Sequence, residues 1–92
     1  MKLSYVYILT NEYRTTFYIG VTGNLRARII KHKEGVGSKF TFKYNVKDLV
    51  YIEEFSDITE AIKREKQLKN WRHDWKVNLI KERNPNLKTL EL

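Results

Sequence analysis

A phenol, a guanidinium and an imidazole occur close together in residues 17–32, on Tyr18, Arg28 and His32. Arg28 and His32 are four residues apart, so on a helix their side chains lie on the same face. Such groups can donate, accept or hold a proton, and the guanidinium can neutralise a negative charge. Because they adjoin apolar residues of a predicted strand and helix, this stretch is the first candidate for a reactive site.

Glu65 is the second unusual position, because it falls among the apolar residues of a predicted helix. That helix carries an apolar stripe with spacings of three and four residues, formed by Ile58, Ala61, Ile62 and Leu68. An isolated carboxylate is costly to bury there, so we expect a cationic partner or a metal ion. Lys69 and Arg72 lie on the same side of the helix. The helix alone favours an ion pair, with metal binding as the alternative.

The elements that position these residues follow the order strand, strand, helix, strand, helix, helix. Periodicity and turn residues predict strands at 3–9, 16–19 and 48–55 and helices at 25–34, 57–70 and 74–81. The short link between the first two strands favours an antiparallel hairpin, with Tyr5 and Tyr7 on one face. The expected fold class is α/β (α+β), a three-stranded antiparallel sheet flanked by helices.

Turn and cap residues set the limits of the first helix. We expect Asn24 to cap its N-terminus and Gly35 to end it. Gly20 and Gly23 bracket the preceding turn, where we expect backbone angles that other residues resist. Residues 39–45 alternate basic and aromatic side chains and are predicted to form a loop, either pinned by its aromatics or stacked on nucleic acid.

The length of 92 residues predicts a single domain. We expect it to span residues 1–83, followed by a loosely held C-terminal tail over 84–92. Trp71 and Trp75 are expected to be core residues that anchor the last two helices to the sheet.

The composition favours a polyanionic partner. Eighteen Lys and Arg against eleven Asp and Glu give a formal net charge of +7, which suits nucleic acid first and an anionic membrane second. The absence of cysteine excludes a disulfide framework and a thiolate metal site, and it fits a reducing, cytoplasmic location. The apolar run at 3–9 is too short to span a membrane, and it reads as a strand rather than a signal peptide.

Two short motifs resemble those of the GIY-YIG nuclease family. One stands intact as Tyr18-Ile19-Gly20, and the other reads Tyr5-Val6-Tyr7, with Tyr5 at the position of the name-giving glycine. A second departure is Val21, where the excision-repair members of the family carry a lysine. The first departure affects packing, and the second removes one cation from the expected site.

The rest of the family pattern follows in order. Arg28 lies ten residues after the motif tyrosine Tyr18, and His32 lies four residues further on. The helix sequence 60–69 is similar to the signature around the family's metal-binding glutamate, which falls on Glu65. The resemblance covers nearly the whole chain, and it is strongest to small stand-alone bacterial members.

This resemblance implies a metal-dependent endonuclease that hydrolyses phosphodiester bonds in DNA. One Mg²⁺ or Mn²⁺ ion would be held by Glu65. Arg28 would neutralise the scissile phosphate, and His32 would hold a tyrosine or assist proton transfer. Tyr18, Tyr7 or both would position and deprotonate the attacking water, and which of them is the base stays open. The basic residues expected to contact the nucleic acid are Lys31, Lys39, Lys43, Lys69 and Arg72.

A catalytically silent nucleic-acid-binding module with the same fold is the alternative. Each residue also has a structural explanation: the tyrosines as half-buried strand residues, Arg28 as a surface cation and His32 as a hydrogen-bonded helix residue. Their joint occurrence with Glu65 favours the enzyme. We expect no obligate protein partner, and the sequence does not determine the oligomeric state.

Overall fold

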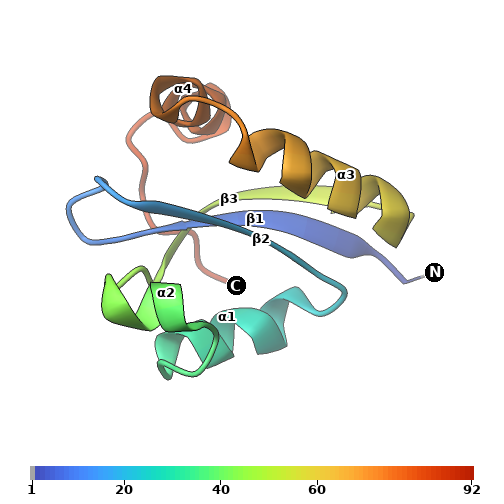
Figure 1. The fold of residues 1–92 in the computed structure, drawn as a ribbon, viewed down its shortest axis with the longest axis horizontal. Coiled ribbons are helices and arrows are strands. Elements are labelled where there is room, and N and C mark those ends of the chain that lie inside the picture. Colours follow the sequence, from blue (N-terminus) through green and yellow to red (C-terminus); the bar gives the residue numbers. More distant parts are fainter. Residues whose placement is uncertain (1) are drawn as a thin grey trace.

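The computed structural model describes residues 2–92 as a sheet with helices on both faces (Figure 1). In chain order the elements are β1 (Ser4–Thr10), β2 (Phe17–Thr22), α1 (Leu25–Lys33), α2 (Lys39–Lys43), β3 (Asp48–Phe55), α3 (Ile58–Lys69) and α4 (His73–Arg83). Apart from α2 this is the predicted order, and the predicted fold class is confirmed. In residues 2–92 no helix combines the length and the apolar character that crossing a membrane requires.

β1 is the central strand of the sheet. The strand order is β2-β1-β3, and both pairs are antiparallel, which confirms the predicted hairpin. Every residue of β1 except Tyr5 is buried, as expected for a strand that is hydrogen-bonded on both edges and covered on both faces. β2 therefore lies at an edge of the sheet, with its outer side unpaired.

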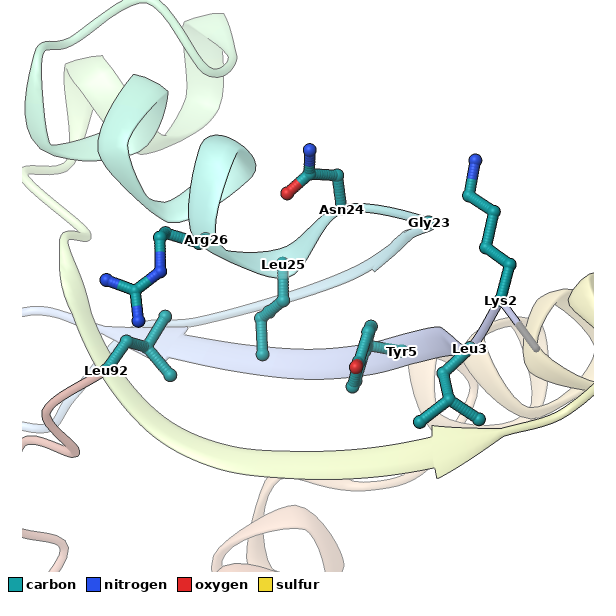
Figure 2. A pocket seen from close by; sticks show the side chains of 8 residues that line it. All are labelled: Lys2, Leu3, Tyr5, Gly23, Asn24, Leu25, Arg26 and Leu92. Atoms are coloured by element: carbon teal, nitrogen blue, oxygen red, sulfur yellow. The ribbon is translucent and has the colours of Figure 1, made fainter.

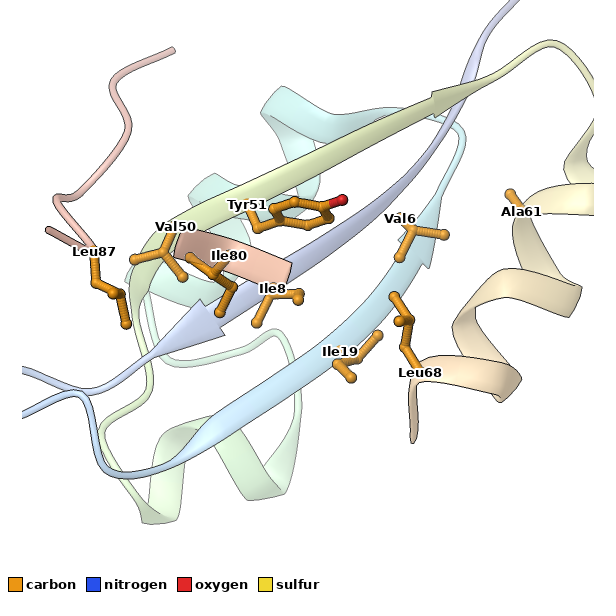
Figure 3. Close-up of a cluster of buried hydrophobic side chains, with 9 residues drawn as sticks. All are labelled: Val6, Ile8, Ile19, Val50, Tyr51, Ala61, Leu68, Ile80 and Leu87. Carbon is orange, nitrogen blue, oxygen red and sulfur yellow. The ribbon is translucent and has the colours of Figure 1, made fainter. Parts of the chain in front are cut away.

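Alternating side chains divide the core into two layers. Val6 and Ile8 of β1 pack with Ala61 and Leu68 of α3 on one face (Figure 3). Tyr7 and its neighbours pack on the other face, against α1. Burial of a large aliphatic side chain contributes roughly 2 kcal/mol, so both layers hold β1 and fix the helices that flank it (Figure 1).

The stretch predicted as a loop at 39–45 contains the short helix α2, so that prediction is wrong. Ser38 caps the helix, because its side chain accepts a hydrogen bond from the backbone nitrogen of Thr41 at 3.1 Å. Thr41 is buried, whereas Phe42 is 68% exposed. The cap by Ser38 and the burial of Thr41 stabilise a helix here, although the alternation of basic and aromatic residues had indicated a loop.

The predicted roles of the glycines are only partly correct. Asn24 caps α1 through a 3.2 Å hydrogen bond from the nitrogen of Ala27, and Gly35 follows that helix at φ 82°, as expected. Gly20 and Gly23 do not adopt positive φ angles. Instead β2 continues through Gly20 to Thr22, so the turn begins later than predicted.

Several predicted core positions on the last two helices lie at the surface. Trp75 is 49% exposed, and Ile58 and Ile62 are 45% and 38% exposed, so these predictions are wrong. Ala61 and Leu68 are fully buried as expected, and Trp71 packs partly buried against the same layer. Ala61 and Leu68 are the buried residues of α3, so the helix contacts the sheet along a narrow stripe and its flanks lie in solvent.

Residues 84–92 are held to the sheet rather than loose. The amide of Asn84 donates to the carbonyl of Val50 at 3.0 Å, and the nitrogen of Leu90 donates to the carbonyl of Leu49 at 2.7 Å. Leu87 is buried with the α3 layer. The prediction of a loose tail is thus wrong, because these contacts lie far from it in sequence, and the domain limit at residue 83 stays a prediction.

Candidate active site

The phenol ring of Tyr7 extends from β1 over Gly20 of the edge strand β2. The two residues are paired in the sheet, and a Cβ atom at residue 20 would lie 2.3 Å from both Cζ and Oη of Tyr7. A side chain at this position would collide with the phenol. The glycine of the Tyr18-Ile19-Gly20 motif therefore provides space for Tyr7, and its role is steric rather than conformational.

The hydroxyl of Tyr7 connects the sheet to α1. It lies 3.0 Å from Nε2 of His32 and accepts a 3.2 Å hydrogen bond from Nε of Arg28. Tyr7 is fully buried and His32 is 1% exposed, whereas Arg28 is half-buried. The spacing of four residues places Arg28 and His32 on the face of α1 that meets this hydroxyl.

The hydrogen bonds continue from His32 to α2. Nδ1 of His32 lies 3.1 Å from Oγ1 of Thr41, whose hydroxyl donates to the carbonyl of Ser38 at 3.2 Å. Because a carbonyl only accepts, the hydroxyl proton of Thr41 points to Ser38, and Oγ1 of Thr41 accepts a hydrogen bond from the protonated Nδ1 of His32. Nε2 of His32 then carries no proton and accepts the hydrogen bond of the Tyr7 hydroxyl. The buried Tyr7, His32 and Thr41 thus form one satisfied chain that holds α1, α2 and β1 together.

The sequence reasoning did not identify Ser38, Thr41 and Gly37 as part of this network. A Cβ atom at residue 37 would lie 2.3 Å from Nδ1 of His32, so Gly37 makes room for the imidazole as Gly20 does for the phenol. The helix-capping pattern of Ser38 and Thr41 was the available signal. Nothing local in the sequence relates Gly37 to His32.

Burial governs the ionisation of the three linked groups. It raises the pKa of Tyr7 above its ordinary value, and the hydrogen bond from Arg28 offsets this only in part. The hydroxyl of Tyr7 raises the pKa of Arg28. Burial, helped by the nearby charge of Arg28, lowers the pKa of His32 to about 4. At neutral pH the site thus holds a neutral phenol, a neutral imidazole and a cationic guanidinium.

We expect His32 to make the folded protein less stable at acidic pH. Its pKa falls from 6.5 to about 4 on folding, so between these values the unfolded chain binds a proton that the folded chain does not. This stabilisation is complete above pH 6.5 and is lost as the pH falls toward 4, by about 2 to 3 kcal/mol at pH 4.5. Chemical unfolding at pH 7.5 and 4.5 measures it.

The variant His32→Gln isolates this effect from the titration of carboxylates. Glutamine does not titrate. Between pH 7.5 and 4.5 the variant should therefore lose about 2 to 3 kcal/mol less unfolding free energy than the wild type. The same replacement at the exposed His73 controls for removal of a histidine elsewhere. Equal pH dependence of wild type and His32→Gln would contradict the prediction.

Tyr18 lies beside this buried chain and is itself half-buried. Its ring centroid is 6.4 Å from that of Tyr7 and 5.5 Å from that of His32. On its other side the ring stacks on Phe40 of α2, at 6.0 Å and 30°. Tyr18 therefore stands between the buried network and the surface, where a water molecule can reach it.

Glu65 reaches the same region from α3, on the other face of the sheet. Its negative charge adds to the raised pKa of Tyr7, after the larger effect of burial, so the carboxylate lies within electrostatic range of that hydroxyl. Its side chain is only 14% exposed, and Oε2 pairs with Nζ of Lys69 at 2.9 Å. The expected cationic partner is therefore present, and it occupies one of the two carboxylate oxygens.

The predicted nucleic-acid contacts are spread over the surface. Lys69 lines a cavity of about 260 Å³ together with Tyr18, and Lys43 lies over the ring of Tyr44 at 5.3 Å. Lys31 and Lys39 are exposed on α1 and α2. Arg72 pairs with Asp74 at 3.3 Å. Among the five, only Lys69 lines a cavity together with Tyr18.

The comparisons with known proteins identify the family. The family model of the GIY-YIG catalytic domain matches residues 3–78. The chain belongs to the GIY-YIG family. Within it, this GIY-YIG domain is 39% identical over 83 residues to the UPF0213 protein SH2523 of Staphylococcus haemolyticus, covering 90% of this chain and 100% of that protein.

Two further relatives agree in length and fold. The UPF0213 protein SSP2268 of Staphylococcus saprophyticus is 37% identical over 82 residues, covering 89% of this chain and 99% of that protein. The solution NMR structure of the UPF0213 protein BH0048 from Bacillus halodurans has 30% sequence identity and a TM-score of 0.59, covering 91% of this chain and 88% of that one. This GIY-YIG domain is therefore similar to small proteins of about its own length.

GIY-YIG nucleases commonly use a divalent metal ion, which the donor set of this domain can accommodate. In residues 2–92 no group of three or more acidic or histidine side chains gathers into a metal site. Glu65 is the acidic side chain whose charge acts on Tyr7, and one of its oxygens is engaged by Lys69. A single carboxylate fits Mg²⁺, because this ion keeps several waters and binds substrate phosphate oxygens.

Proposed function

We propose that this GIY-YIG protein is a metal-dependent endonuclease that hydrolyses phosphodiester bonds in DNA. The guanidinium of Arg28 carries the proposal. The buried hydroxyl of Tyr7 holds its Nε, and among the ion pairs of residues 2–92 no carboxylate engages it. A positioned guanidinium that no carboxylate neutralises suits the oxygens of a phosphate. The net charge of +7 supports a polyanionic substrate.

The burial of the two tyrosines supports different roles for them. Tyr18 is half-buried at the surface of the site, so in this proposal its hydroxyl holds the attacking water. The new bond joins that water oxygen to phosphorus as the bond to the leaving oxygen breaks. The attacking water gives up one proton to solvent, and the leaving oxygen takes one from solvent. Tyr7 is fully buried and acts as a positioning residue for Arg28.

The ionisation of the buried network disfavours Tyr7 as the base. Removing the proton of a phenol with a pKa near 10 costs roughly 4 kcal/mol at neutral pH, and burial raises the pKa of Tyr7 further. His32 is a weak proton acceptor, because burial lowers its pKa to about 4. The neutral imidazole is better suited to orient the phenol than to deprotonate it.

Glu65 would hold the metal ion in this proposal, with waters and phosphate oxygens completing the coordination. The ion would supply positive charge near the leaving oxygen. Lys69 would release the carboxylate, and the phosphate of a bound strand is a suitable new partner for its ammonium.

The second candidate function is a nucleic-acid-binding module without catalysis. The 2.9 Å ion pair between Glu65 and Lys69 favours it, because a carboxylate that keeps this partner is less available to a metal ion. Binding and basic charge would be the same in both cases. The two candidate functions differ only in whether bound DNA is cleaved.

Cleavage by the full chain tests the proposal. End-labelled duplex, single-stranded and branched DNA are incubated with the protein and Mg²⁺ or Mn²⁺, and a parallel sample contains EDTA. We expect shortened products with either ion and none in EDTA. If all three DNA forms are bound but stay intact with both ions, the silent binding module is supported and the nuclease proposal fails.

A further inference from the structure

A groove runs along the unpaired outer side of β2. Three consecutive residues of β2, Phe17, Tyr18 and Ile19, line it, and its volume is about 260 Å³. Phe40 of α2 borders it, together with Lys69 of α3 and Lys76 of α4. We call this the β2-edge groove. Helices from both faces of the sheet contribute to it because β2 is the edge strand.

The rings of Tyr18 and Phe40 line the aromatic side of the groove. Phe40 stacks on Tyr18 at 6.0 Å and 30°, and its contact with Tyr44 is tilted, at 4.8 Å and 48°. Phe40 is nevertheless 41% exposed, although its apolar ring would gain free energy from burial. Its neighbour Thr41 belongs to the buried network of His32, so the ring is held at a set position beside the candidate active site.

The other side of the groove is cationic. Lys69 and Lys76 are the charged residues that line it, and its lining contains no acidic residue. Lys69 also pairs with Glu65, which places the groove directly next to the proposed metal ligand. An apolar aromatic surface opposite ammonium groups matches a nucleotide, whose base has a flat apolar face and whose phosphate is anionic.

We propose that the β2-edge groove binds one unpaired base next to the scissile phosphate, stacked on Phe40, with the adjoining phosphate on Lys69 or Lys76. This rests on the proposed nuclease function and adds a substrate class, namely DNA with a single-stranded segment at the cleavage point. In an intact duplex both faces of a base are already stacked, and exposing one costs a few kcal/mol. Single strands, overhangs and flaps avoid that cost.

Binding in EDTA tests the groove independently of cleavage. Fluorescence anisotropy measures the affinity of the full chain for a labelled oligothymidylate and for a blunt duplex of equal length. Phe40→Ala should weaken single-strand binding by about 5- to 100-fold, the loss expected for one base–aromatic stack. Binding of the blunt duplex should change by less than about twofold, because a closed duplex does not use the groove.

Phe42→Ala is the matched control. Phe42 lies on the same helix but borders a different cavity, with Gly35 and Val36, so its removal should leave single-strand binding unchanged. Phe40→Leu keeps an apolar side chain on α2 but has no aromatic face, and we expect it to lose most of the stacking contribution, which separates stacking from a folding defect. Equal affinities of Phe40→Ala, Phe40→Leu and Phe42→Ala, or an equal loss on the blunt duplex, would overturn the proposal.

Crosslinking locates the base directly. An oligonucleotide that carries 5-iodouracil should crosslink on irradiation to a peptide containing Phe40 or Tyr18, and attachment only outside the groove residues would overturn the proposal. The two hypotheses fail separately. Cleavage with no dependence on Phe40 rejects the groove alone, whereas Phe40-dependent binding without cleavage rejects the nuclease alone.

Discussion

Replacing Glu65 by glutamine is expected to abolish metal-dependent cleavage and to leave DNA binding nearly unchanged. Glutamine keeps the size of the side chain but removes the charge that would hold the ion. The loss should be at least about 10³-fold in rate, because a catalytic metal contributes several kcal/mol to the transition state. Gel assays of cleavage and anisotropy of DNA binding in EDTA provide the two measurements.

The structure offers a matched control for this experiment on the same helix. Glu60 is exposed and pairs with Lys63 at 3.5 Å; it lies five residues before Glu65, on the opposite side of α3. Glu60→Gln should cleave like the wild type. Glu65→Gln should also fold normally, since its pair with the half-exposed Lys69 contributes about 1 kcal/mol at most. A Glu65→Gln protein that still cleaves, or that no longer binds DNA, would reject the assigned role.

Replacing Gly20 by alanine should both destabilise the protein and inactivate it. The new Cβ atom would lie 2.3 Å from Cζ and Oη of Tyr7, so the phenol must move. Its hydrogen bonds to His32 and Arg28 would then break. We expect a loss of about 1 to 3 kcal/mol in unfolding free energy and about 10²-fold or more in cleavage rate, because Arg28 would lose its orientation.

Gly23 provides the control for this substitution. It borders a separate cavity of about 330 Å³ at the start of α1 (Figure 2). A Cβ atom there would meet only the flexible end of Lys2, at 3.4 Å, so Gly23→Ala should resemble the wild type in chemical unfolding and in cleavage. Equal stability and activity of the Gly20 and Gly23 variants would contradict the steric role.

The two variants test opposite sides of the site. Glu65 comes from α3, whereas Tyr7, Arg28 and His32 come from β1 and α1. The edge of the sheet is where side chains from both faces can meet, since no further strand separates them. Loss of cleavage from both changes, together with retained DNA binding, would support a single site assembled across that edge.

Residues close together in sequence were predicted well. The order of strands and helices apart from α2, the cap at Asn24, the C-terminal Gly35 and the common face of Arg28 and His32 all follow from backbone propensity and helical spacing. The helical position of Glu65 also indicated its partner, and Lys69 pairs with it. Such features depend on interactions between residues within one or two helical turns, so residue types and spacing are enough to predict them.

Contacts between distant segments were decided only by the tertiary structure. The hydrogen bond of His32 to Thr41, the space that Gly20 leaves for Tyr7 and the stacking of Phe40 on Tyr18 each join separate elements. The same holds for the exposure of Trp75 and the docking of Leu90. A side chain's type and local spacing are independent of its surroundings. Its burial, its neighbours and its ionisation depend on which segments pack against it, and that arises only when the whole chain folds.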